Sequence, residues 1–206
     1  MTQRGTTRTR GAPWTYALIL TLAFDLLLGA KAQADSTNHD RELLAFLSQY
    51  EPSLAAWPTV RARLTTPETE LARIAADPAL RSVVRIRAID LLGLSPESKT
   101  ALAAVRRAST DKGTYVRRAA LLTLASRFAA HLTGADRVVI RTAAATPQHQ
   151  LQVVAVRALA LLEDPTSAEL LRRLARTSSD ASIRELAARL VPIGPSSGLT
   201  APGSRK

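Results

Sequence analysis

The side chains best suited to proton transfer or metal binding are few in this sequence. Its three histidines share no metal-ligand spacing with one another or with a carboxylate; they are His39, His131 and His149. Asp90 is the only acid within a strongly apolar helical segment, and general-base catalysis there would need a partner that the sequence does not show. We expect Asp90 to face solvent or to pair with Arg87 or Arg118.

Recognisable catalytic motifs are also missing from the sequence. There is no G-x-S-x-G elbow, no glycine-rich phosphate loop and no pair of catalytic carboxylates. The chain contains no cysteine, which excludes disulfides, thiolate zinc sites and a cysteine nucleophile. We therefore expect a non-enzymatic protein without a cofactor or metal, although enzymatic activity is disfavoured rather than excluded.

Arginines are the more promising candidates for function. One group lies in the first turns of the most apolar helical segments: Arg85, Arg87, Arg117, Arg118 and Arg184. A second group lies in the last turns of the intervening segments: Arg106, Arg107, Arg172, Arg173 and Arg176. Because the start of the second helix in an antiparallel pair lies near the end of the first, we expect these arginines to form a binding edge. The structural alternative is that they complement helix dipoles and pair with turn aspartates such as Asp111 and Asp180.

A repeated apolar pattern indicates the elements that must carry these arginines. The segment at residues 111–128 has apolar residues at a helical period, and three other segments copy it. Their aligned columns are Val84, Val116, Val154 and Ile183; Ala88, Ala120, Ala158 and Ala187; Ile89, Leu121, Leu159 and Ala188; and Leu92, Leu124, Leu162 and Val191. The alanine column repeats at steps of 32, 38 and 29 residues, which is within the size of a two-helix repeat unit.

Two stretches of the chain, DKGTYVRRAALLTL and EDPTSAELLRRLARTSSDASIRELAARLV, resemble the HEAT-like repeats of bacteria. These are also called phycobilisome-lyase HEAT-like repeats, and the resemblance covers about residues 77–191. It implies an all-α fold, a right-handed α-solenoid of stacked antiparallel helix pairs. It also implies a scaffold more often than a catalyst, although lyase-like handling of a chromophore remains an alternative.

Proline pairs mark the expected helix starts within the repeat region, residues 67–191. Five pairs place an N-cap residue before a proline at the first helical position: Thr66-Pro67, Asp77-Pro78, Ser95-Pro96, Thr146-Pro147 and Asp164-Pro165. The expected helices cover residues 68–76, 79–92, 97–108, 114–128, 135–145, 148–162, 166–176 and 181–191. The four helices with the aligned columns should form an inner layer, and the helices that start at residues 97, 135 and 166 an outer layer.

The N-terminal residues are typical of an export signal. Three arginines precede an apolar run at residues 16–29, and a small-x-small site ends at Ala34. We expect residues 1–34 to be a cleavable signal peptide, with Asp35 as the mature N-terminus and the protein periplasmic or secreted. The alternative is a membrane anchor at residues 16–29, but this run is shorter than the ~20 residues that span a bilayer and contains Asp25.

The remaining segments flank the repeats. Residues 35–66 are expected to form a helical N-terminal cap, with Leu43, Phe46, Leu47 and Tyr50 on one face of a helix at 40–50. The aromatic residues of this cap, including Trp57, could alternatively line a ligand pocket. Residues 192–206 are rich in proline, glycine and serine and are expected to be a disordered tail.

The charge of the chain indicates the class of partner. Without residues 1–34 the chain keeps 24 basic and 16 acidic residues, a net charge of +8. An exported protein seldom meets nucleic acid, so an acidic protein or an anionic envelope surface is the expected partner. A nucleic-acid-binding repeat protein is the alternative if the N-terminal segment does not direct export, and the absence of aromatic residues between the arginines argues against base stacking.

Overall fold

A computed structural model describes residues 40–49 and 53–191 of the 206-residue chain. Within these residues every regular element is helical, and there is no strand. The chain divides into two units, residues 1–46 and 47–206, so that the division falls inside the predicted cap at 35–66. The predicted signal peptide, its cleavage site between Ala34 and Asp35, the alternative anchor and the predicted tail at 192–206 lie outside the described residues.

The first described helix covers residues 40–48 and continues across the division between the units. Leu43, Phe46 and Leu47 are buried, as the helical period predicts for one face. Tyr50, which was predicted to extend that face, is not among the described residues. Trp57 is buried at the first residue of a short helix, α2.

The second unit contains nine labelled α-helices. They are α2 (Trp57–Arg61), α3 (Pro67–Ala76), α4 (Ser82–Leu92), α5 (Lys99–Ala108), α6 (Thr114–Arg127), α7 (Gly134–Ala144), α8 (His149–Ala160), α9 (Pro165–Thr177) and α10 (Ala181–Leu190). Two single turns of 3-10 helix, η1 (Leu54–Ala56) and η2 (Ala129–His131), lie before α2 and after α6.

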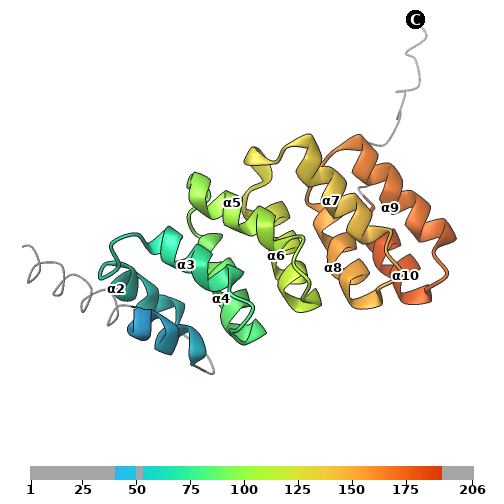
Figure 1. The fold of residues 1–206 in the computed structure, drawn as a ribbon. Coiled ribbons are helices and arrows are strands. Elements are labelled where there is room, and N and C mark those ends of the chain that lie inside the picture. Colours follow the sequence, from blue (N-terminus) through green and yellow to red (C-terminus); the bar gives the residue numbers. More distant parts are fainter. Residues whose placement is uncertain (1–39, 50–52, 192–206) are drawn as a thin grey trace, which may run out of the picture. The chain divides into compact units, whose positions relative to one another are not determined.

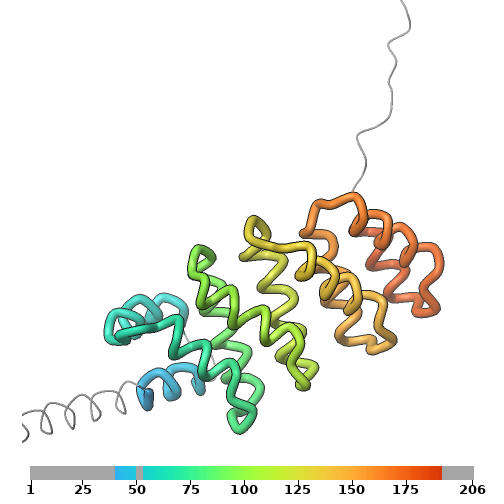
Figure 2. The backbone as a smooth tube through the Cα atoms, turned by 45° about the horizontal axis from the view of Figure 1, so that its top comes forward, coloured from blue at the N-terminus to red at the C-terminus, as the bar shows by residue number. Residues whose placement is uncertain are grey.

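Neighbouring helices of the second unit pack in a regular order. The helices α4, α6, α8 and α10 contact one another in succession, and each is also packed against at least one of α3, α5, α7 and α9. Figure 2 shows the same succession of helices from a second direction. The predicted alternation of two kinds of helix therefore corresponds to observed packing partners.

The aligned apolar columns form the buried core of this succession. The valine and isoleucine column and the alanine column are buried at all four positions, and all four alanines are fully inaccessible to solvent. Alanine lets two helix backbones approach closely, because no larger side chain separates them. Ala188 is the exception in the third column: it is exposed on α10, where Ile89, Leu121 and Leu159 are buried in the preceding helices.

Of the five predicted pairs, two place proline at the start of a helix, and these helices are α3 and α9. The prediction was wrong for the other three pairs, because α4, α5 and α8 begin two to four residues after the proline. Ser95 shows one physical reason: its hydroxyl donates a hydrogen bond to Glu68 Oε1 at 2.9 Å, and Ser98 caps α5 instead. Asp77 accepts a hydrogen bond from the backbone N–H of Ala79 in a turn that precedes α4.

None of the helices in the described part of the chain is both long and apolar enough to cross a bilayer.

Gly93 provides a test of how closely α4 and α6 must approach. A Cβ atom at Gly93 would lie 2.9 Å from Cγ2 of Thr123 and 3.1 Å from Cγ of Arg127, both on α6. We expect Gly93→Ala to lower the free energy of unfolding by about 1–3 kcal/mol through overpacking. Urea unfolding measures this effect. The control is Gly134→Ala at the start of α7, where a Cβ atom meets nothing within 4 Å, and equal stability of the two variants would contradict the prediction.

Candidate binding surface

The first of the predicted edge arginines, Arg85, is buried and holds two helices together. Its Nε donates to the carbonyl of Ala75 at 2.9 Å, at the end of α3, and its Nη atoms pair with the carboxylate of Asp111. Asp111 also accepts from the backbone N–H of Gly113 at 2.7 Å, immediately before α6. Burial opposes the ionisation of Asp111, but the hydrogen bonds from Arg85 and Gly113 outweigh it and hold the pKa of that carboxyl below its ordinary value.

A second arginine of the predicted edge, Arg106 on α5, makes the corresponding contact with α7. Its Nε and Nη2 bind the two carboxylate oxygens of Asp136 at 2.9 and 2.8 Å. Asp136 is buried and forms a capping box with Thr133 at the start of α7. Burial opposes its ionisation, yet the hydrogen bonds from Arg106 and Thr133 prevail and lower the pKa of Asp136.

The same arrangement joins α7 to α9 through Asp164, a predicted helix cap, and two arginines outside the predicted edge. Asp164 caps α9 by accepting from the backbone N–H of Ser167 at 2.9 Å. Its other carboxylate oxygen accepts from Arg137 Nη1 at 3.2 Å, and Arg141 lies 3.7 Å from Oδ1. The signal that could have found this pair is spacing: Arg137 precedes Asp164 by 27 residues, and Arg106 precedes Asp136 by 30.

Between α6 and α8, the corresponding arginines bind uncharged glutamine side chains instead of carboxylates. Arg117 donates to Oε1 of Gln148, the N-cap residue of α8, at 2.9 Å. Arg118 reaches Gln150 Oε1 at 3.4 Å, and its guanidinium lies 5.6 Å from the ring centroid of exposed Tyr115. These two predicted edge arginines therefore contact residues of the protein itself.

At the start of α10, three residue types of a hydrolase triad meet without forming a nucleophilic site. His149 Nδ1 lies 2.6 Å from Asp180 Oδ2, and Ser182 Oγ donates to Asp180 Oδ1 at 2.7 Å. A serine nucleophile needs its hydroxyl bonded to the imidazole, whereas this serine is bonded to the carboxylate. The hydrogen bond from Ser182 is the main cause of the lowered pKa of Asp180, about 2, and the cluster serves as a helix cap with an inter-helix contact.

Four other members of the predicted edge are held within the molecule. Arg184 donates to the carbonyls of Ser178 and Ser179 at 2.7 and 3.1 Å, which satisfies backbone groups next to the start of its own helix. Arg87 donates to the backbone carbonyls of residues 47 and 49. The remaining two pair with Glu169 on their own helix, α9; they are Arg172 and Arg176.

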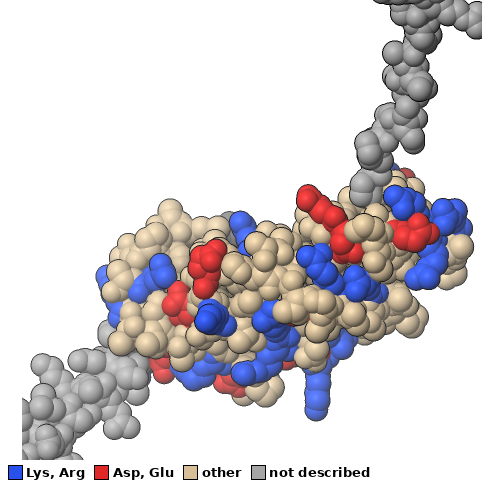
Figure 3. All heavy atoms as spheres, turned by 90° about the horizontal axis from the view of Figure 1, so that it is seen from above, with Lys and Arg blue, Asp and Glu red and all other residues tan. Residues whose placement is uncertain are grey.

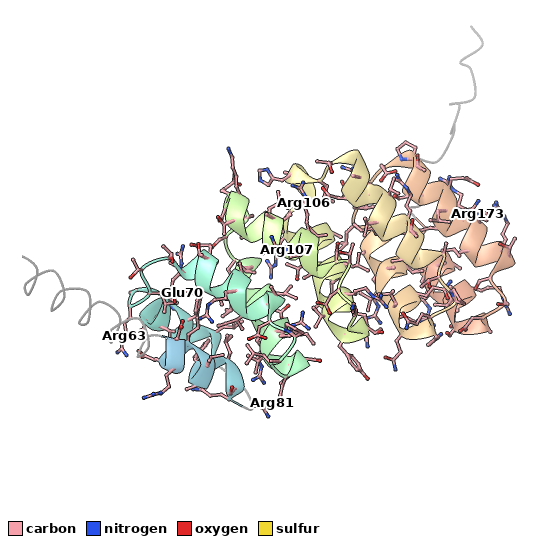
Figure 4. All side chains as sticks on the ribbon, viewed as in Figure 1. Arg63, Glu70, Arg81, Arg106, Arg107 and Arg173 are labelled. Carbon is pink, nitrogen blue, oxygen red and sulfur yellow. The ribbon has the colours of Figure 1, made fainter. Side chains whose placement is uncertain are left out.

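Arg107 and Arg173 differ from the other eight. Both are exposed, and among the described residues neither side chain makes a hydrogen bond or an ion pair. Figure 4 shows them on two different helices, α5 and α9. Of the ten arginines predicted to form an edge, eight are thus occupied by contacts within the chain, and two make no such contact among the described residues.

Each available arginine lines a groove between two helices. Arg107 lines a groove of about 890 Å³ between α3 and α5, and Arg173 lines one of about 400 Å³ between α7 and α9. Both grooves are hollow surfaces within the described residues that carry unpaired positive charge.

Asp90 is exposed, as one of the two sequence alternatives proposed, and it pairs with neither Arg87 nor Arg118. Nearby protein atoms desolvate its carboxyl group and raise its pKa to about 6, while the positive charge of Arg127 partly opposes this shift. Because Asp90 keeps contact with solvent, hydration limits the effect of the shift on stability. Within the described part of the chain, no group of three or more histidine, cysteine, aspartate or glutamate residues could hold a metal ion.

The lowered pKa of Asp136 predicts a specific dependence of stability on pH. Asp136→Asn removes the charge that binds Arg106, and we expect a loss of about 1–3 kcal/mol at pH 7. A carboxyl group with a lowered folded-state pKa contributes stability above its unfolded pKa of about 4 and loses it as the pH falls through the folded-state value. The deficit of the variant should therefore shrink between pH 5 and pH 3 in urea unfolding. Glu163→Gln, at an exposed residue, is the control, and a deficit independent of pH would contradict this account.

Comparison with known proteins adds no assignment to this surface, because no protein-family model matches the sequence and no curated protein matches it significantly.

Proposed function

We propose that this protein is a non-enzymatic helical-repeat scaffold that binds an acidic protein partner. In this proposal the packed helices form a right-handed, HEAT-like α-solenoid of stacked antiparallel pairs. The observation that carries the choice of partner is the distribution of unpaired charge over the described residues.

The repeat architecture is supported by equivalent residues in equivalent places. Ala88, Ala120, Ala158 and Ala187 are all fully buried, and the four helices that carry them pack in succession. The inter-helix pairs also recur at separations of 26 to 31 residues. Repeats that bury their apolar faces only against neighbours and are linked by one recurring contact are the basis of helical solenoids.

Most acidic side chains of the described residues are occupied by hydrogen bonds or ion pairs, with Asp90 and Glu163 as exceptions. Asp111, Asp136, Asp164 and Asp180 each bind a cation or histidine from a preceding helix and also accept a hydrogen bond at a helix start. Among the exposed cations, by contrast, several make no hydrogen bond or ion pair in the described structure: Arg81, Lys99, Arg107, Lys112, Arg157 and Arg173. The positive surplus therefore lies on the surface, where it favours an acidic partner.

The surface charges are distributed in a way that favours a protein partner over a phosphate backbone. Figure 3 shows lysine and arginine side chains interspersed with aspartate and glutamate on one face. Binding along a nucleic acid or a lipid surface gains from an uninterrupted row of cations that replaces many counterions. Scattered cations beside grooves suit local contacts with acidic side chains, and this supports the proposed acidic protein segment.

Export is part of the proposal and has its own test. If residues 1–34 are a cleaved signal peptide, N-terminal sequencing of the protein purified from its native host should begin at Asp35, and the protein should be found in the periplasm or medium. An intact N-terminus in the membrane fraction would favour the anchor at residues 16–29. An intact N-terminus in the cytoplasm would contradict export. It would also favour the alternative of a nucleic-acid-binding repeat protein.

Binding can be tested with defined probes. We expect the purified protein to bind a fluorescein-labelled peptide of alanine and glutamate, about 16 residues long so that it can form a helix, and to release it as salt screens the charges. Fluorescence anisotropy measures the affinity. A lysine and alanine peptide of the same length is the control. Absence of binding to the acidic peptide at low salt, or much tighter binding to duplex DNA or phosphatidylglycerol vesicles, would contradict the proposed partner.

A further inference from the structure

The groove between α3 and α5 has a regular lining. Both helices contribute residues at positions i, i+3, i+4 and i+7, so one stripe of each helix faces the groove. The α3 stripe is Thr69, Ala72, Arg73 and Ala76, and the α5 stripe is Thr100, Ala103, Ala104 and Arg107. Lys99 and Asp77 complete the lining. The groove therefore combines a floor made largely of methyl groups with charged side chains at its margins.

The groove between α7 and α9 is built on the same stripes with different side chains. Its α9 stripe is Thr166, Glu169, Leu170 and Arg173, so that glutamate and leucine stand where α5 has two alanines. This groove is smaller, about 400 Å³ against about 890 Å³. Larger side chains at the two central positions of the α9 stripe are consistent with the smaller volume, because they occupy more space than alanine.

The two grooves also differ in charge, and the larger groove carries the greater positive charge. Lys99 and Arg107 line the α3–α5 groove without a hydrogen bond or ion pair among the described residues, and Arg73 adds a third positive charge. Its one acid is Asp77. In the α7–α9 groove Arg141 lies 3.7 Å from a carboxylate oxygen of Asp164, so Arg173 is the one unpaired cation there. The larger groove is thus also the more positive.

We infer that the α3–α5 groove is the docking site for an acidic segment of the partner protein, which rests on the proposed function above. Carboxylates of the segment pair with Lys99 and Arg107, and small apolar side chains lie on the alanine floor. Removal of water from the floor strengthens the ion pairs at its margins, because a lower local dielectric constant increases their attraction.

Residues 1–34 and 192–206 are poor sources of this acidic segment. Residues 192–206 contain Arg205 and Lys206 and no acid, and residues 1–34 contain four basic residues and one acid, Asp25. A second copy of the described region is also a poor occupant, since most of its acids are bound to its own cations or helix starts. The occupant is therefore a segment of another protein.

The same groove fits the backbone of a nucleic acid poorly. A phosphate backbone has no small apolar group to cover the methyl floor, and two unpaired cations with Arg73 replace few counterions. An acidic segment that also carries small apolar side chains matches both features, because its carboxylates can pair with the cations while its apolar groups cover the methyl floor. Charge complementarity and the apolar floor thus indicate one class of occupant.

Three variants of the full chain separate the groove from the general surface charge. Lys99→Glu with Arg107→Glu reverses the charge of the α3–α5 groove, and Ala103→Trp fills it without changing the charge. Arg173→Glu is the matched control, since it reverses the equivalent arginine in the other groove. The probe is the labelled alanine and glutamate peptide, and thermal unfolding followed by circular dichroism verifies that each variant is folded.

We expect the double reversal to weaken peptide binding about tenfold or more, Ala103→Trp to weaken it severalfold, and Arg173→Glu to change it less than twofold. Equal loss in the double reversal and in Arg173→Glu would overturn the docking site, and so would unchanged binding by Ala103→Trp. Either result leaves the proposed function standing. If the wild-type protein does not bind the peptide at all, the proposed function itself fails.

Discussion

The packing of this protein depends on aspartate carboxylates that each cap the start of one helix and bind a side chain of an earlier helix. At the starts of α6, α7, α9 and α10 an aspartate accepts a backbone N–H and also binds a side chain from a preceding helix. Helix starts expose unsatisfied N–H groups and carry partial positive charge, so a carboxylate is favoured there before any partner arrives. The arginine or histidine then fixes which earlier helix lies beside it. One residue thereby specifies both where a helix begins and where it is placed.

Because each of these aspartates also binds a side chain from an earlier helix, few of the predicted edge arginines lack a partner within the chain. A carboxylate that is partly buried needs its positive partner, because removing one member of such a pair leaves a charge without compensation. Arg85 and Arg106 are therefore structural, although they stand beside surface residues of the same type. The excess of arginine over acid in the composition is carried by the remaining exposed cations. Structural and binding roles are thus divided among arginines that look alike in the sequence.

The sequence predicts the helices and their buried faces better than it predicts the contacts of individual arginines. Burial of the alanine column follows from periodicity alone, because only one face of each helix can meet its neighbours. Arg106 and Arg107 are adjacent and identical in type, yet one binds Asp136 and the other faces a groove. That difference depends on the rotation of α5 relative to α7. The periodicity of residues within one helix does not predict how that helix is rotated relative to its neighbour.

Helix starts show a related limit. A proline after a capping residue is compatible with a first turn, but the side chain of the capping residue can be used elsewhere, as Ser95 is used by Glu68. Loops of different length can therefore precede equivalent helices, while the buried columns of those helices stay the same. Variation at exposed stripe positions is equally free, and it changes the size and charge of a groove, as the difference between Ala103 and Glu169 illustrates. A repeated core can therefore keep one fold while its grooves differ, and selectivity for a partner arises from the positions at which the repeats disagree.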